Sequence, residues 1–217
     1  MFQTSIILSC ILISIFLKNI CLASLLLIDP KNPCRAYGNA SVYDITDLVD
    51  TWPVALNGPG FGGKYIYWWS CAGNTGKCDD TDVAVCQQRA DAPELQFNAG
   101  NVSPQLWYGL FNGPASKSNL TWDIVYPNHQ ANPSFIDGTG IRVTAVHFIV
   151  DSAIEKPILT VDGEEKYTEY SITVRGKCIG QPAINQTTFV QGYCDPKTGQ
   201  VVPGPYINKI IKLFPKI

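Results

Sequence analysis

The chain has 217 residues, of which 46% are hydrophobic and 16% are charged, and its formal net charge is −2. This length suits a single domain, and the apolar content is high enough to bury a core, which excludes a disordered chain. The sequence contains no basic patch or run, so we expect no nucleic-acid partner.

The first 23 residues are typical of a secretory signal peptide. Ile6 to Leu17 is an almost unbroken apolar run, shorter than the ~20 residues that a membrane-spanning helix needs. It leads to Cys21-Leu22-Ala23, a site of the small-residue kind that a signal peptidase could cut. A signal anchor is the alternative, because no Lys or Arg precedes the apolar run. No later stretch is long and apolar enough to span a bilayer, so we expect residues 24–217 to be one exported domain.

Short β-rich runs follow in chain order, separated by turn signals. The ten expected strands are residues 41–45, 64–69, 83–87, 94–97, 106–111, 120–126, 141–150, 158–162, 167–175 and 187–193. The expected turns are LNGPGFGG, FNGPAS, IDGTG, VDGEE and DPKTG. Only Ile45 to Val54 has a helical stripe. The pattern predicts an all-β fold, an antiparallel β-sandwich or flattened β-barrel of about nine to ten strands.

Side-chain alternation along residues 141–150 predicts an unusual strand face. Arg142 shares its face with the apolar residues Val146 and Phe148, while His147 lies on the opposite face. A buried unpaired charge is costly, so Arg142 should meet an acid or a polar site. A salt bridge at the rim of the sheet is the structural alternative to a binding role.

The cysteines of the mature chain predict disulfide staples. They are Cys34, Cys71, Cys78, Cys86, Cys178 and Cys194. An even number in an exported chain favours disulfides. The sequence has no C-x-x-C pair and no histidine cluster, so a zinc site is disfavoured.

Four N-glycosylation sequons agree with an exported chain. They begin at Asn39, Asn101, Asn119 and Asn185. A glycan requires a surface position. Pro104 follows the second sequon, and we expect it to lower glycosylation there.

Known catalytic motifs are absent from the sequence. Its two histidines are His129 and His147, and it has no G-x-S-x-G, H-E-x-x-H or Cys–His pairing motif. We therefore expect no enzymatic activity, no cofactor and no metal.

Six segments, in this order along the chain, resemble mannose 6-phosphate receptor homology domains. They are CRAYGNASVYDITDLVD, YIYWWSC, VAVCQ, LTWDIVYPN, GIRVTAVHFIVD and EEKYTEYSITVRGKC, which together span residues 34–178. Members of that family bind mannose through a Gln, an Arg, a Glu and a Tyr. The resemblance transfers these roles to Gln87, Arg142, Glu165 and Tyr170, with Glu164 and Tyr167 as alternatives for the last two. Such groups suit vicinal sugar hydroxyls, because Arg donates, a carboxylate accepts, and Gln does both.

The cysteines depart from the family pattern. Val150, Thr168 and the loop NHQANPSFIDGTG stand where the family usually has cysteines. The resemblance pairs Cys34 with Cys71. Proximity in the sequence suggests the pairs Cys78–Cys86 and Cys178–Cys194. The missing loop cysteine weakens the expectation of phosphate recognition.

The resemblance implies a soluble lectin domain for mannose-type N-glycans or glycoproteins, acting in quality control or sorting. Its compartment would be the lumen of the secretory pathway, in the ER or lysosome, or the exterior. One alternative is an interaction module that keeps this fold without a sugar site. Another is a non-catalytic, glycan-presenting subunit of a glycosidase.

Overall fold

The computed structural model describes residues 23–38, 41–78, 81–110, 121–128, 142–166, 168–185 and 190–203. These residues form strands and turns, and none of them is helical. Residues 46–53, where the sequence had suggested a helical stripe, form turns and bends instead. Across the described ranges there is accordingly no helix that could cross a membrane. The expected signal peptide lies outside these ranges, except for Ala23.

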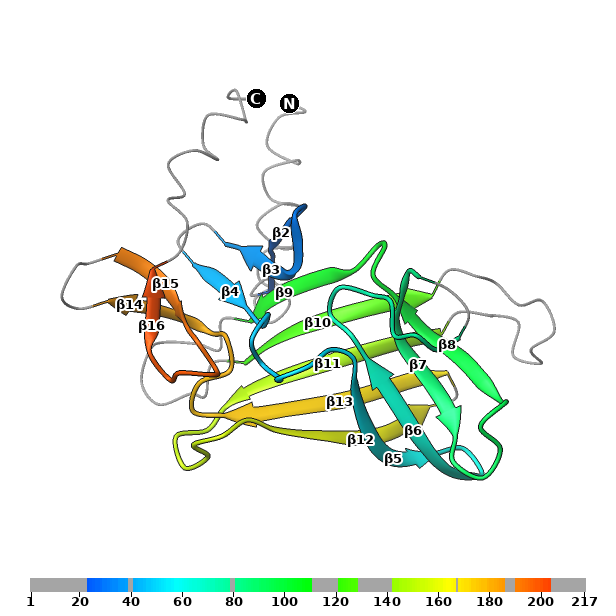
Figure 1. Cartoon of the computed structure of the whole chain (residues 1–217). Helices are drawn as coiled ribbons and strands as arrows, with labels where there is room; N and C mark the ends of the chain where they lie inside the picture. The colour runs from blue at the N-terminus through cyan, green and yellow to red at the C-terminus, as the bar shows by residue number, and fades with distance from the viewer. Residues whose placement is uncertain are drawn as a thin grey trace, which may run out of the picture.

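Two main sheets form the body of the molecule (Figure 1). The six-stranded sheet has the order β1 (Ala23–Leu25), β9 (Leu106–Leu110), β10 (Thr121–Asn128), β11 (Arg142–Val150), β13 (Glu169–Gly176) and β12 (Ile158–Lys166). The four-stranded sheet has the order β5 (Val54–Gly60), β6 (Gly63–Trp69), β7 (Val83–Arg89) and β8 (Gln96–Asn101). All neighbours are antiparallel except β11 and β13. The predicted all-β sandwich is therefore confirmed.

Aromatic side chains fill the space between the two sheets. Trp122 and Phe148 stack with ring centroids 3.7 Å apart. Trp69, from the four-stranded sheet, approaches Phe148 to 6.3 Å and donates a hydrogen bond to the Tyr126 hydroxyl at 3.4 Å. All four side chains are buried. His147 lies on the outer face, 2.8 Å from Asp123, as the alternation predicts.

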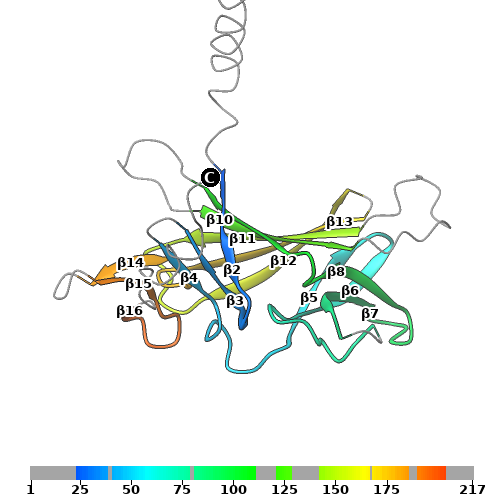
Figure 2. The same ribbon diagram turned by 90° about the horizontal axis from the view of Figure 1, so that it is seen from above.

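Two small three-stranded sheets complete the described chain. One contains β2 (Leu27–Asp29), β3 (Asn32–Tyr37) and β4 (Val42–Asp44), and the other contains β14 (Pro182–Asn185), β15 (Val190–Cys194) and β16 (Val201–Pro203). Of these strands, only β4 and β15 overlap strands expected from the sequence. Seen from above, β14–β16 and β5–β8 lie at opposite ends of the six-stranded sheet (Figure 2). The backbone N–H of Asp44 donates to Gly180 O at 3.0 Å, which links the two small sheets.

The expected turn LNGPGFGG is wrong over most of its length. Residues Val54–Gly60 form strand β5, and the turn comes at Phe61 and Gly62. A Cβ atom on Gly58 would lie 2.5 Å from the side chain of Val161 in β12. Gly58 therefore lies in a strand rather than in a turn. The absence of a side chain there lets β5 approach β12 closely.

The expected turn VDGEE is also wrong, because it lies within β12. The pairing of β12 with β13 shifts register twice, around Asp162 and around Glu165. Gly163 has a φ of 107°, and a Cβ there would lie 2.7 Å from Pro59. These bulges place polar residues inside a strand, which gives the sequence the composition of a turn.

Three disulfides tie the described elements together. They join Cys34 to Cys71, Cys78 to Cys86, and Cys178 to Cys194. These are the three pairs expected from the sequence. The second pair attaches the loop after β6 to the middle of β7.

Candidate functional site

Gln87 lies on the inner face of the four-stranded sheet. The strand register places it opposite Tyr67 on β6 and opposite Phe97 on β8, so these three side chains share a face. The Gln87 side chain is buried, with the residue only 3% exposed. Its Nε2 donates to the Tyr67 hydroxyl at 3.0 Å, and that hydroxyl donates to Pro59 O at 2.7 Å.

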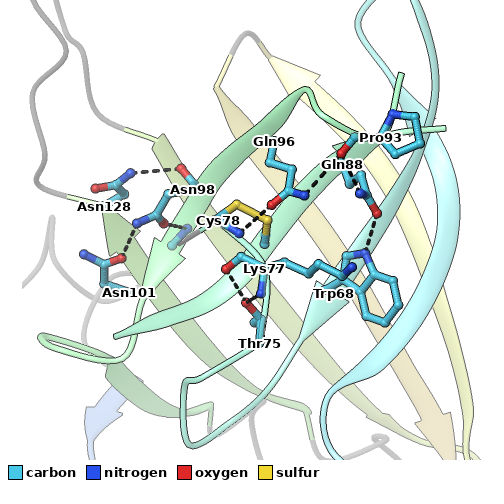
Figure 3. The surroundings of a disulfide bond; sticks show 12 residues. Trp68, Thr75, Lys77, Cys78, Gln88, Pro93, Gln96, Asn98, Asn101 and Asn128 are labelled. Atoms are coloured by element: carbon cyan, nitrogen blue, oxygen red, sulfur yellow. Dashed lines mark hydrogen bonds between the residues drawn. A yellow bond between two sulfur atoms is a disulfide. The ribbon is translucent and has the colours of Figure 1, made fainter. Parts of the chain in front are cut away.

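The neighbouring residue Gln88 lies on the other face, beside the disulfide shown in Figure 3. Its Oε1 accepts the indole N–H of Trp68 at 2.9 Å, and its Nε2 donates to Pro93 O at 2.7 Å (Figure 3). The backbone N–H of Cys78 donates to the side chain of Gln96 at 2.6 Å. The Cys78–Cys86 disulfide and the hydrogen bonds around it thus lie on the outer face. Of the two adjacent glutamines, only Gln87 faces the other sheet.

Arg142 and Tyr170 lie on the inner face of the six-stranded sheet. Arg142 is the first residue of β11, and the register of β11 with β13 pairs Thr144 with Tyr170. Nη1 of Arg142 donates to the Tyr170 hydroxyl. The guanidinium also lies 4.9 Å from the ring centroid of Phe97 and 5.9 Å from that of Tyr170, within the range of a cation–π contact.

Aromatic rings connect these two groups at one end of the sandwich. The rings of Tyr67 and Tyr170 meet edge to face with centroids 6.1 Å apart. Phe97, the register partner of Gln87, lies against Arg142. The structure therefore brings Gln87, Arg142 and Tyr170 around a shared set of aromatic neighbours, although they come from two different sheets.

The two candidate glutamates differ in their placement. Glu164 pairs with Tyr170 across β12 and β13, and its two oxygens accept the backbone N–H groups of Thr168 at 2.7 Å and Phe61 at 3.1 Å. Glu165 follows at the second bulge of β12. The side chain of Glu165 and the whole of Tyr167 lie outside the described part of the chain.

Burial raises the pKa of the Tyr67 hydroxyl to about 12. The hydrogen bond from Gln87 acts in the opposite direction, and the charge of Glu164 acts in the same direction as burial. The phenol is therefore neutral at physiological pH and keeps its proton for a hydrogen bond.

Tyr67 and Phe97 were not among the residues singled out from the sequence. The alternation of YIYWW places Tyr67 on the same face as Trp69, and this signal could have identified it. Phe97 becomes recognisable only from the register between β7 and β8, because the bulges near Val85 shift that pairing. Across the described segments, no cluster of three or more metal-ligating side chains occurs.

The second sequon does not meet the requirement for a surface position. Asn101 is 8% exposed, and its Oδ1 accepts a hydrogen bond from Asn98 at 2.7 Å (Figure 3). This burial disfavours a glycan on Asn101, and its glycosylation stays a prediction. Asn185 is the last residue of β14, while Asn39 and Asn119 lie outside the described residues.

Comparisons with known proteins show a similarity of fold to solved structures. No protein-family model matches the chain. No curated protein matches it either. Among solved structures, domain 11 of chicken IGF2R is similar with a TM-score of 0.43 and 14% identity, over 69% of this chain and 92% of that chain.

Proposed function

We propose that this chain is a lectin domain that binds mannose-type N-glycans through Gln87, Arg142, Tyr170 and Glu165. The observation that carries the proposal is that Phe97 is the register partner of Gln87 and that its ring lies 4.9 Å from the guanidinium of Arg142. These two polar side chains come from opposite sheets, and each is held by a tyrosine hydroxyl. The same residues are those that the resemblance to mannose 6-phosphate receptor homology domains selects.

The chemistry of the cluster suits a pyranose. Arg142 supplies only donors, Gln87 supplies both a donor and an acceptor, and the hydroxyl of Tyr170 can serve in either role. The rings of Phe97 and Tyr170 restrict the guanidinium, which lowers the ordering cost of binding. A ligand with several adjacent hydroxyls is the natural complement of such a set.

We assign the acceptor carboxylate to Glu165 rather than to Glu164. Both oxygens of Glu164 already accept backbone N–H groups, from Phe61 and Thr168. Its role is to hold two turns together. Glu165, at the neighbouring bulge, is the other member of the adjacent pair Glu164–Glu165.

We further propose that the protein acts in the lumen of the secretory pathway or outside the cell, and binds glycans without hydrolysing them. The three disulfides favour an oxidising compartment. The partners would be mannose-containing glycoproteins, and binding would require no metal.

Binding to a glycan array tests the proposal. Protein produced through the secretory pathway of cultured cells, with intact disulfides, should bind high-mannose glycans. Free mannose should compete, galactose should not, and EDTA should have no effect. A folded protein that binds no glycan would favour an interaction module without a sugar site. Steady release of free sugar by the pure protein would contradict the non-enzymatic assignment, and co-purification with a glycosidase would identify a glycan-presenting subunit.

A further inference from the structure

The hydrogen bonds of Tyr67 have a defined direction. Pro59 contributes a backbone carbonyl, which can only accept, so the Tyr67 hydroxyl must donate its proton to it at 2.7 Å. The hydroxyl has only one proton. Toward Gln87, 3.0 Å away, it can therefore act only as an acceptor.

This direction determines which end of the Gln87 amide faces Tyr67. Since Tyr67 accepts, Gln87 must present its NH₂ group there. Gly60 lies on the same side, because a Cβ built on it would be 3.0 Å from Nε2 of Gln87. The amide oxygen is consequently turned away from β5.

The oxygen of Gln87 is an acceptor in a buried side chain. The residue is 3% exposed, and among the described residues Oε1 accepts no hydrogen bond, while Nε2 donates to Tyr67. Oε1 is also not one of the fully enclosed side-chain atoms without a partner in this part of the chain, so the oxygen keeps contact with solvent. A ligand that covers this oxygen removes its water, and leaving the oxygen without a donor would then be costly. A ligand hydroxyl that donates would satisfy it.

We infer that Tyr67 is a positioning residue that fixes the Gln87 amide with its oxygen toward the ligand, so that one hydroxyl of the bound sugar must donate its proton to Gln87. This inference rests on the proposed function, in that the ligand is a sugar. It adds a rule of selection, because the site then discriminates against sugars with an acceptor but no donor at that position.

Deoxy and deoxyfluoro mannosides test the rule, since fluorine replaces a hydroxyl without its proton. With the wild-type protein, both analogues at one position should bind roughly 3- to 10-fold more weakly than the parent mannoside, the range for a lost hydrogen bond. In Tyr67→Phe the amide is free to turn over, so the penalty for the fluoro analogue at that position should shrink. A position read by Glu165 should keep its penalty in both proteins.

Tyr65→Phe is the matched control. Tyr65 lies on the same strand and face, and its hydroxyl donates to Phe61 O at 3.1 Å rather than contacting Gln87. This variant should retain the wild-type analogue profile. The inference is overturned if Tyr67→Phe also retains it, or if wild type binds every fluoro analogue as tightly as the parent.

A measurement without ligand separates this inference from the lectin proposal. In NMR, the side-chain amide protons of Gln87 should exchange slowly with solvent in wild type and in Tyr65→Phe, and several-fold faster in Tyr67→Phe. Equal exchange in all three proteins would overturn the role of Tyr67. If wild type binds no mannoside, the lectin proposal fails, and the exchange rates still decide whether Tyr67 orients Gln87.

Discussion

The carboxylate of Glu164 accepts the backbone N–H of Phe61, which lies 103 residues earlier in the chain, at 3.1 Å. Its other oxygen accepts the N–H of Thr168 at 2.7 Å. Thr168 has a φ of 72°, in the left-handed region that is unfavourable for a β-branched residue. One side chain therefore holds the turn between β5 and β6 against the turn between β12 and β13.

Glu164→Gln should lower the free energy of unfolding by about 1 kcal/mol, because an amide has only one acceptor oxygen and would direct its NH₂ at a backbone donor. Urea denaturation measures the change. Glu94→Gln, at an exposed acid, is the control and should leave stability unchanged. If the two variants are equally stable, the carboxylate does not hold the turns.

Arg142→Ala should remove most mannose binding, at a cost of about 2–4 kcal/mol, the range for truncating a hydrogen-bonded charge at an interface. Arg142→Lys should also fail, because an ammonium lacks the planar fork of a guanidinium. Titration calorimetry would measure both. Arg175→Ala is the control, since Arg175 is exposed on the outer face of β13. A folded Arg142→Ala protein that binds mannose like wild type would refute the assigned site.

The three disulfides should contribute unequally to stability. The Cys34–Cys71 bond closes a loop with a sequence separation of 37, compared with 8 for Cys78–Cys86. In the chain-entropy account, removing the first pair by paired Cys→Ala substitutions should cost about 4 kcal/mol and removing the second about 2.5 kcal/mol. Chemical denaturation of the two double variants compares them, and the reverse order would show that loop length does not govern their effect.

Alkaline pH should destabilise the fold through Tyr67. Its pKa is raised by burial from the ordinary value of 10 to about 12, so the folded state favours the protonated phenol. This stabilisation is complete below pH 10 and is lost as the pH rises toward 12. The free energy of unfolding should fall by about 1–2 kcal/mol over that interval, after allowance for solvent screening.

Tyr67→Phe should show a shallower decline over the same pH interval. Complete burial also raises the pKa of Tyr126, so part of the decline should persist in this variant. Stability measured at pH 9, 10 and 11 tests the difference. Identical slopes for wild type and Tyr67→Phe would show that Tyr67 titrates normally.

The sequence by itself determined the fold class, the faces of several strands and the disulfide pairs. Alternation is a local property of a strand, so the inward faces of Phe148 and Tyr170 and the outward face of His147 could be read from residue order. The two cysteine pairs with the shortest separations could also be predicted, because their partners lie near each other in the sequence.

Only the tertiary structure decided where turn-like residues become strands and which side chains meet. Gly58 and Gly163 were predicted to lie in turns, but they lie in strands, where a Cβ would collide with Val161 or Pro59 across the interface. Tyr67 contacts Gln87 because β6 pairs with β7. Phe97 contacts Arg142 because the two sheets pack face to face. Such relationships depend on contacts between segments far apart in the chain, and local residue preferences contain no information about them.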